Sequence, residues 1–178
     1  MSAHIAPIQP EDATGAAREL LDEAKRKFGR VPEMIKVMAN SPALLRSYLT
    51  LSAVVADGAV APAREQLAIA NAQRNGCEYC LSAHTLRGRN VAHLPAEELD
   101  AARKGESGDP HVAALLRLMR EIAATAGDVS LEEVAAARAA GVTDEEIGEL
   151  VVNVALDTIS NYFNVLADVR NDWPVVSL

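Results

Sequence analysis

The chain contains only two cysteines, and they stand three residues apart in the segment Cys77-Glu-Tyr-Cys80. Gly76 precedes them and is typical of the end of a helix, so we expect the cysteines to open the next helix. Thiols in the first turn of a helix face unpaired backbone N–H groups and the positive end of the helix dipole, and both favour thiolate. The spacing also brings the two sulfurs within bonding reach. The segment therefore predicts a redox-active pair that cycles between dithiol and disulfide.

Two further residues are placed to move protons for this pair. His84 follows Cys80 by four residues, so it lies on the same helix face one turn along. The rise along a helix is roughly 6 Å from Cys80 to His84 but roughly 10 Å from Cys77, so direct proton exchange favours Cys80. Folding the two helices back on each other at the glycine turn places Glu65 beside His84 or Arg87. A carboxylate that orients an imidazole, which in turn activates a thiol, predicts a Glu65–His84 proton relay.

Purely structural roles for the same residues also stay open. Free cysteines are often small buried hydrophobic side chains, and an acid such as Glu65 stabilises the dipole near a helix N-terminus. Structural zinc is a further alternative, because the two cysteines and His84 supply three of the four ligands that zinc needs. The candidates for the fourth ligand are Glu65, His4, His93 and His111. No second pair of Cys/His ligands accompanies the motif, so we expect no metal.

Helix signals divide the whole chain, and little in it favours a sheet. First-turn prolines, capping residues and glycine stops predict helices over about 13–28, a short piece after Pro32, and then about 42–57, 62–75, 78–90, 95–105, 112–126 and 144–170. Two capping boxes are expected, Ser130 with Glu133 and Thr143 with Glu146. Much of the 49% apolar fraction is alanine, which has the highest helix propensity. The sequence predicts an all-α fold in a single domain of residues 1–178, or two small lobes that share a core.

A faint internal repeat also runs through the chain. Residues 62–84 and 143–165 align without gaps, which places Glu65 over Glu146 and His84 over Val165. The repeat predicts a duplicated helical hairpin in which only the first copy kept the cysteines. In the last helix, Asn161, Asn164 and Asp168 share one face. We interpret them as partners for buried helix ends or for an oligomer interface.

Composition excludes several classes of protein. The net charge is −8 and no Lys/Arg cluster stands out, so the chain lacks the positive surface that a nucleic-acid binder needs. No apolar run approaches the roughly 20 residues that span a bilayer, and residues 1–11 do not read as a secretory signal. We therefore expect a cytoplasmic protein that binds neither nucleic acid nor membrane. In that compartment a C-x-x-C pair indicates redox or metal chemistry and not a structural disulfide.

The spacing of these residues resembles a known family. Glu65, eleven residues, Cys-x-x-Cys, three residues and His84 looks like the active-site signature of alkylhydroperoxidase D-like (AhpD-like) proteins, a branch of the carboxymuconolactone decarboxylase family. The stretch Asn161-Tyr-Phe-Asn-Val-Leu-Ala-Asp168, followed by Asp172-Trp-Pro, is similar to the family's last helix and tail. The resemblance covers most of the chain from about Pro32 to Pro174. It implies an AhpD-like helical bundle and a homo-oligomer, with a trimer or hexamer preferred.

The resemblance also implies a role for each site residue. Carried onto matching positions, Cys80 is the peroxidatic cysteine, Cys77 is the resolving cysteine, and Glu65 and His84 relay protons. Tyr79 stands where type members have a histidine. A tyrosine can donate a hydrogen bond there, but its pKa near 10 makes it a poor base. Val165 likewise occupies a position where many relatives carry a histidine.

Two functions are compatible with this sequence. The first is an oxidoreductase that reduces hydrogen peroxide or organic hydroperoxides through the cysteine pair and is restored by an external dithiol. The alternative is a non-catalytic helical oligomer or redox-stress sensor whose cysteine pair only switches state. No haem, flavin or nicotinamide motif is present, so we expect no cofactor besides the cysteines themselves.

Overall fold

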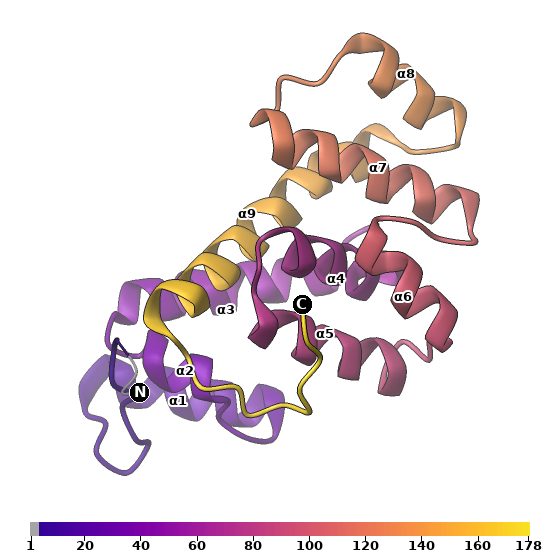
Figure 1. Ribbon diagram of the computed structural model, residues 1–178. Coiled ribbons are helices and arrows are strands. Elements are labelled where there is room, and N and C mark those ends of the chain that lie inside the picture. The colour runs from indigo at the N-terminus through magenta and orange to yellow at the C-terminus, as the bar shows by residue number, and fades with distance from the viewer. Residues whose placement is uncertain (1–3) are drawn as a thin grey trace.

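The computed structural model describes residues 4–178, and within them all regular structure is helical. The all-α prediction is confirmed. Figure 1 shows the helices in chain order. Their bounds are α1 Gly15–Phe28, α2 Glu33–Met38, α3 Pro42–Ala56, the 3₁₀ turn η1 Ala61–Ala63, α4 Arg64–Arg74, α5 Glu78–Asn90, α6 Ala96–Lys104, α7 Pro110–Thr125, α8 Leu131–Ala139 and α9 Asp144–Ala167.

Helix α4 lies between two apolar cores. The first core combines residues of α1, α2, α3 and α5, and the second combines residues of α4, α7 and α9. Within α4, Ile69 belongs to the first core and Leu67 to the second, and both side chains are fully buried. All eight residues from 65 to 72 are buried, so this stretch has no side that faces solvent, and its polar side chains Glu65, Gln66 and Asn71 find partners inside the protein.

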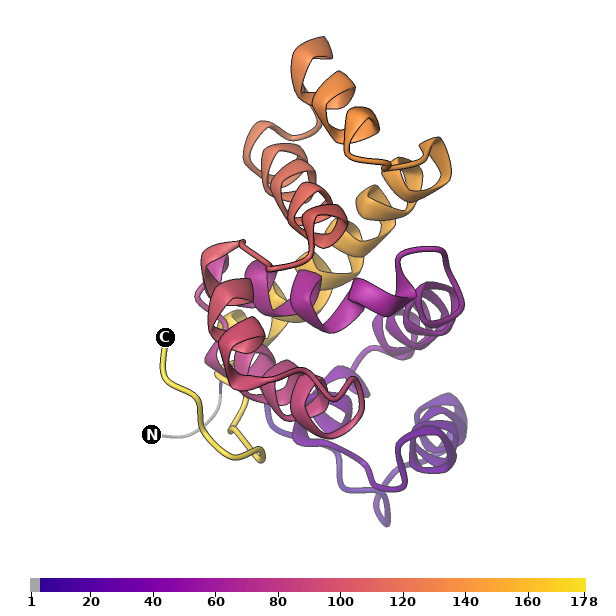
Figure 2. The same ribbon diagram turned by 90° about the vertical axis from the view of Figure 1, so that its right-hand side faces the viewer.

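Helix α9 runs along the molecule from one core to the other. In Figures 1 and 2 it extends from the end occupied by α7 and α8 to the end occupied by α1 and α2. Its Leu150 lies in the second core and its Ala167 in the first. The same helix therefore stiffens both halves, and a side chain near its C-terminal end can reach the helices of the first core.

The local signals placed most helix ends within a few residues. The capping box of Thr143 and Glu146 is present in both directions. At Ser130 only half of the expected box forms: its hydroxyl accepts the Glu133 N–H, but the Glu133 carboxylate pairs with Arg117 at 2.6 Å. The duplicated hairpin is not confirmed, because residues 62–84 are split between two helices whereas residues 144–165 lie within one continuous helix.

Helix α9 also corrects the expectation that no segment approaches membrane-spanning length. Among residues 4–178 it is long and apolar enough to cross a membrane, and the bent pair 42–56 and 61–74 would be a second candidate if counted as one broken span. This is weak evidence for a membrane protein, because core helices pass the same test. The buried side of α9 carries Asp157, Asn161 and Asn164, whose partners are other parts of the protein.

The turn between α4 and α5 is a Schellman motif. The N–H of Cys77 bonds to the carbonyl of Ala72 at 3.0 Å, and the N–H of Gly76 bonds to the carbonyl of Gln73 at 3.3 Å. Gly76 has a φ of +65°, which L side chains rarely adopt. The reversal of the chain at this glycine aligns α5 beside α4.

We therefore expect Gly76→Ala to lower the free energy of unfolding by about 1–2 kcal/mol, the cost of a left-handed alanine. An added Cβ meets nothing within 4 Å at Gly76, so backbone strain is the main cause. Gly148→Ala is the matched control, because its Cβ also meets nothing but lies inside α9. That change should stabilise by about 0.5–1 kcal/mol. Urea unfolding compares them, and equal effects would contradict the role given to the turn.

Candidate active site

The two cysteines occupy unequal positions at the start of α5. Cys77 is the N-cap, and its sulfur accepts the backbone N–H of Cys80 at 3.2 Å, as a serine oxygen does at other helix starts. Cys80 lies inside the first turn. Both residues are buried and neither forms a disulfide.

Their environments push the two thiols in opposite directions. The hydrogen bond from the Cys80 thiol is the main cause of the lowered pKa of Cys77. Burial is the main cause of the raised pKa of Cys80, and the hydrogen bond and charge of Cys77 raise it further. The expectation that the helix start favours thiolate at both cysteines is therefore wrong for Cys80, because burial outweighs the dipole there. Cys77 is therefore the more acidic thiol of the pair and Cys80 the less acidic one.

Asn164 of α9 is a further contact of Cys80. Its side-chain N–H₂ donates to the Cys80 sulfur at 3.2 Å and to the Met34 sulfur at 3.1 Å. This contact lowers the pKa of Cys80, against the larger effect of burial. The interpretation of Asn164 as a helix-end or interface residue is therefore wrong. It holds for Asn161, which accepts a hydrogen bond from Asn75 at the C-cap of α4.

Glu65 is held between two cationic or protonatable side chains of α5. One carboxylate oxygen bonds to His84 Nδ1 at 2.8 Å and the other accepts the Arg87 Nε–H at 2.9 Å. Burial alone would raise the pKa of Glu65, but His84 and Arg87 lower it to about 2. The expected placement of Glu65 is present, and it contacts both candidate partners. The catalytic roles of Glu65 and His84 stay predictions.

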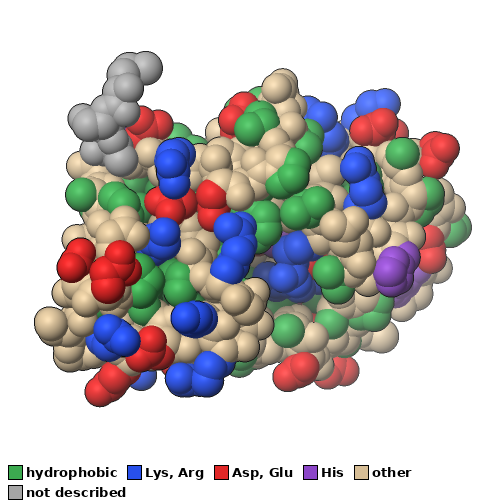
Figure 3. All heavy atoms as spheres, turned by 90° about the horizontal axis from the view of Figure 1, so that it is seen from below, with side chains coloured by type: hydrophobic (Ala, Val, Ile, Leu, Met, Phe, Trp, Pro, Cys, Tyr) green, Lys and Arg blue, Asp and Glu red, His purple; other side chains and the backbone are tan. Residues whose placement is uncertain are grey.

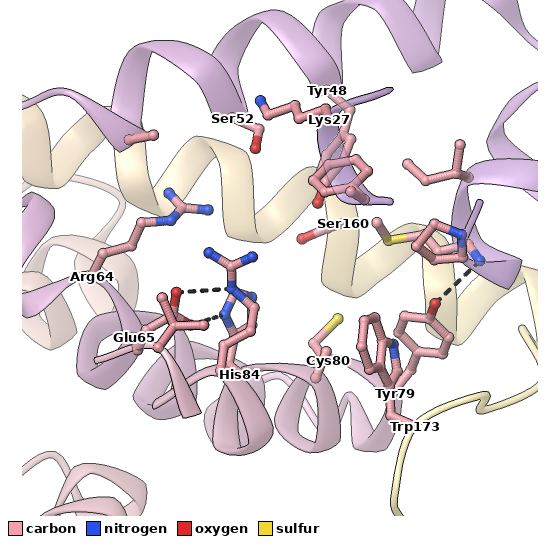
Figure 4. A pocket seen from close by; sticks show the side chains of 18 of the residues that line it. Lys27, Tyr48, Ser52, Arg64, Glu65, Tyr79, Cys80, His84, Ser160 and Trp173 are labelled. Carbon is pink, nitrogen blue, oxygen red and sulfur yellow. Dashed lines mark hydrogen bonds and ion pairs between the residues drawn. The ribbon is translucent and has the colours of Figure 1, made fainter. Parts of the chain in front are cut away.

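The ionised Glu65 fixes the tautomer of His84. A carboxylate only accepts, so Nδ1 carries the hydrogen and Nε2 of a neutral imidazole is left as an acceptor. In Figure 4, His84 and Cys80 project from α5 into the same cavity, with Glu65 beside His84. Nε2 is thus the ring atom available to take a proton from a group bound there.

Tyr79 is directed elsewhere. Its hydroxyl donates to Asp172 of the C-terminal tail at 2.8 Å and accepts the backbone N–H of Met34 at 3.3 Å. Burial and the Asp172 charge raise its pKa well above the ordinary range. Its ring also packs edge-on against Trp173. Tyr79 therefore fastens the tail over α5, and its hydroxyl is not joined to the Glu65–His84 pair.

Asp157 is a buried acid that the sequence analysis did not single out. Its carboxylate accepts the Asn71 side-chain N–H at 2.7 Å, and burial raises its pKa. Its charge also acts to raise the pKa of both cysteines. The only available signal was an acid in the middle of the apolar run of α9.

A cavity of about 730 Å³ opens over Cys80. Figure 3 shows Lys and Arg side chains gathered around a hollow on one face of the molecule. Cys80 lines the cavity and Cys77 does not, so a bound molecule meets Cys80 first. The other residues that line it and enter the argument below are Lys27, Arg30, Tyr48, Ser52, Arg64, Glu65, His84, Arg87 and Trp173.

The histidines proposed as zinc ligands lie in other contacts. His111 bonds to Glu146 at 2.8 Å, and His4 bonds to the backbone carbonyl of Leu166 at 2.9 Å. His93 is exposed, in the loop before α6. Within residues 4–178, no three His, Cys, Asp or Glu side chains are grouped as a metal site would require.

Comparison with known proteins gives one sequence relative and several structural ones. No protein-family model matches the chain. A segment of 84 residues, 46% of this chain, is 38% identical to an alkyl hydroperoxide reductase of Mycobacterium tuberculosis. That segment spans 24% of the relative, so the chain matches about a quarter of the relative's length.

Among solved structures, an alkylhydroperoxidase AhpD core protein of Ralstonia eutropha superposes with a TM-score of 0.82 at 21% identity, covering 96% of this chain and 92% of its own. This chain has the AhpD-like fold. The fold that the resemblance implied is thereby confirmed.

Two further solved structures broaden the comparison. A peroxidase-related protein of Silicibacter matches with a TM-score of 0.76 at 17% identity, over 95% of this chain and 88% of its own. A debrominase in complex with 2,3,4-tribromopyrrole matches with a TM-score of 0.75 at 17% identity, over 97% and 93%. These names favour a peroxidase-related enzyme, while the structural likeness by itself shows the fold.

The difference between the two thiols predicts how their reactivity depends on pH. Only the thiolate is nucleophilic, so alkylation of Cys80 should rise with pH and level off only above the ordinary thiol value of about 8.5. Cys77→Ser keeps an N-cap oxygen but removes the neighbouring thiolate that raises the pKa of Cys80. The midpoint for Cys80 should therefore move to lower pH. Site-resolved mass spectrometry of alkylated peptides measures both midpoints, and coincident midpoints would refute the coupling.

Proposed function

We propose that the chain is a thiol-dependent peroxidase that reduces hydrogen peroxide or organic hydroperoxides through Cys77 and Cys80. One observation carries the proposal: Cys80 faces the cavity beside His84, whose Nδ1 is held by the ionised Glu65. The Cys77 sulfur lies behind Cys80, one helix turn away and in hydrogen-bond contact with it. Nucleophile, base and resolving thiol are thus close together.

The first step oxidises Cys80. Its thiol proton moves to Nε2 of His84, and the imidazolium is stabilised by the Glu65 carboxylate. The thiolate, which receives a hydrogen bond from Asn164, attacks the terminal peroxide oxygen and forms an S–O bond. The O–O bond breaks, and the leaving alkoxide takes the proton from His84. The products are a Cys80 sulfenic acid and an alcohol, or water if the substrate is hydrogen peroxide.

The second step forms the disulfide. The lowered pKa of Cys77 favours its thiolate form, which attacks the Cys80 sulfur. The S–S bond forms, the S–O bond breaks, and the departing hydroxide takes up a proton from solvent to become water. An external dithiol then supplies two electrons by thiol–disulfide exchange and becomes a disulfide itself, which restores both thiols.

The comparisons support peroxide as the substrate class. The sequence relative is named an alkyl hydroperoxide reductase and two structural neighbours are described as peroxidase-related. The debrominase shares only the fold with this chain at 17% identity, so we transfer no halogenated substrate from it. The second candidate function is the redox-stress sensor, which the buried position of both sulfurs favours, since such thiols react slowly.

Turnover separates these two functions. We expect purified protein to consume peroxide repeatedly with a suitable dithiol, and Cys80→Ser to abolish this activity. Cys77→Ser should react once and stall with Cys80 as sulfenic acid, because the resolving thiol is absent. A dimedone-type reagent followed by mass spectrometry locates the label. If the reagent labels Cys77 in Cys80→Ser but does not label Cys80 in Cys77→Ser, the roles of the two cysteines are reversed. A single slow oxidation of the unmodified protein, without turnover, favours the sensor.

The same assay tests the proposed base. His84→Ala should slow the first oxidation of Cys80 by roughly 10²-fold, because His84 is the one imidazole among the described residues that line the cavity with Cys80. His93→Ala is the matched control, since His93 is exposed and outside the cavity. Equal rates in the His84→Ala variant and the unmodified protein would remove His84 from the mechanism.

We also propose that the chain forms a homo-oligomer, with a trimer or hexamer preferred. Four large apolar side chains of α9 are each at least half exposed and follow one stripe along the helix: Val151, Tyr162, Val165 and Leu166. A second copy of the chain would remove this surface from water. The cytoplasmic location expected from the sequence would keep the dithiol reductant available.

Light scattering at micromolar concentration tests the assembly. Leu166→Glu should lower the measured mass, because a charge would be buried in the interface. Leu131→Glu is the control, since Leu131 is 89% exposed but lies on α8, away from the stripe. A monomeric unmodified protein contradicts the proposal, as does an equal response to both substitutions.

A further inference from the structure

The cavity over Cys80 has a charge opposite to that of the whole chain. Four cationic side chains line it, Lys27, Arg30, Arg64 and Arg87, against the single carboxylate of Glu65. The chain as a whole carries a net charge of −8. A cavity lined by one sign of charge between low-dielectric walls concentrates ligands of the other sign.

Two of these cations are already neutralised. Arg87 donates to Glu65 at 2.9 Å, and Arg30 donates to Asp172 at 2.6 Å while it lies over the Trp173 ring. The other two, Lys27 and Arg64, have no hydrogen-bond or ion-pair partner within residues 4–178. Burial is the main cause of the lowered pKa of Lys27; the Arg64 charge lowers it further, and the Glu23 charge acts in the opposite direction. Figure 4 shows both side chains at the same cavity.

The position of Arg64 separates it from the reacting sulfur. It is the first residue of α4, directly before Glu65, whereas Cys80 belongs to α5. In Figure 4, Arg64 and Lys27 enter the cavity from sides different from the one that Cys80 occupies. Arg64 is only partly buried, so its guanidinium is available to a ligand. Its planar donor geometry suits two hydrogen bonds to one carboxylate.

The size of the cavity indicates an organic ligand. Its volume is about 730 Å³, whereas a small molecule such as water occupies about 30 Å³ and drug-sized ligands occupy cavities of about 300–1,000 Å³. Apolar side chains from several parts of the chain form much of the wall: Phe28, Ile35, Ala61, Val91 and Trp173.

Two hydroxyl groups of α3 also face this space. Tyr48 and Ser52 are four residues apart on one side of the helix, and neither has a hydrogen-bond partner within the described part of the chain. Burial raises the pKa of Tyr48 to about 12, so it is a neutral donor at physiological pH. These groups offer polar contacts between the cations and the apolar wall.

We propose that this cavity binds an organic carboxylate with an apolar body, its carboxylate held by Arg64 and Lys27 and its other end directed at Cys80. As a substrate, the molecule would be the hydroperoxide of a carboxylic acid. That reaction rests on the peroxidase function proposed above, whereas the binding of the carboxylate does not. The chemistry of the step is the one already described, because the carboxylate only positions the peroxide.

Binding is tested first, on the reduced protein and without any peroxide. The probes are para-isopropylbenzoate, its methyl ester and para-isopropylphenyl phosphate. Trp173, the one tryptophan of the chain, lines the cavity and reports binding by fluorescence. Protection of Cys80 from alkylation locates the ligand.

The carboxylate should bind at least tenfold more tightly than the ester, and more weakly as salt increases. Stronger binding of the ester would overturn the inference, and stronger binding of the phosphate would replace carboxylate by phosphate as the bound group.

Variants then identify the cations. Arg64→Gln should remove most of the preference for carboxylate over ester, Arg64→Lys should keep part of it, and Lys27→Gln should reduce it to a smaller extent. Arg89→Gln and Arg26→Gln are matched controls, because both arginines are exposed on the same helices as cavity residues but do not line the cavity. Circular dichroism checks that each variant folds. An unchanged preference in Arg64→Gln, or a loss shared by the controls, would overturn the assignment.

Turnover distinguishes failure of the inference from failure of the proposed function. Cumene hydroperoxide and its para-carboxylate are compared by kcat/KM, and the carboxylate should be preferred by at least tenfold, a preference that Arg64→Gln abolishes. If both are consumed equally and the benzoate does not bind, the carboxylate site is wrong while the peroxidase stands. If neither is consumed but the benzoate binds through Arg64, the peroxidase is wrong while the site stands.

Discussion

The buried charge of Glu65 constrains everything around it. An ionised carboxylate removed from water is destabilising unless each oxygen has a partner, and removing one partner from a buried pair costs about 3–5 kcal/mol. Both partners come from α5, so α5 must lie beside the first turn of α4. The Schellman turn at Gly76 meets this condition, and the same turn leaves Cys77 at the N-cap. The pKa of Glu65 is depressed to about 2, so its contribution to stability is present above the unfolded value of about 4.3 and is lost as the pH falls towards 2.

The same turn produces the difference between the two thiols. An N-cap sulfur receives the backbone N–H that the first turn leaves unpaired, whereas a sulfur three residues later competes only for side-chain donors. Asn164 supplies that donor from α9, but burial has the larger effect on Cys80. The cysteine that faces the cavity is therefore the less acidic one. A raised pKa keeps more of the Cys80 sulfur in the protonated, less nucleophilic form.

How much of this arrangement could be predicted depends on the sequence distance over which each contact acts. Caps, prolines and glycines act over a few residues, so they are enough to predict where the helices lie. The contact between Glu65 and His84 could also be predicted, because two helices joined by a turn at Gly76 bring together residues that are equally distant from that turn. Asn164 lies 84 residues from Cys80, and no local signal relates them. The raised pKa of Cys80 was missed for the same reason, since its burial is due to helices distant in the sequence.

Helix α9 links this site to the other half of the molecule. The helix is long enough to reach from the second core to the first. Between them it places Asp157, Ser160 and Asn164 beside the cavity and the cysteines. Buried polar groups in an apolar helix are destabilising unless they find partners. Asp157 finds one in α4, Ser160 in the backbone of α9, and the Asn164 N–H₂ at the Cys80 sulfur, while the Asn164 side-chain oxygen has none among the described residues. The position of α9 along its axis is therefore fixed by polar contacts as well as by apolar packing. Because a shift by one residue would remove the donor from Cys80, the fit of the two cores and the reactivity of the thiol depend on the same helix.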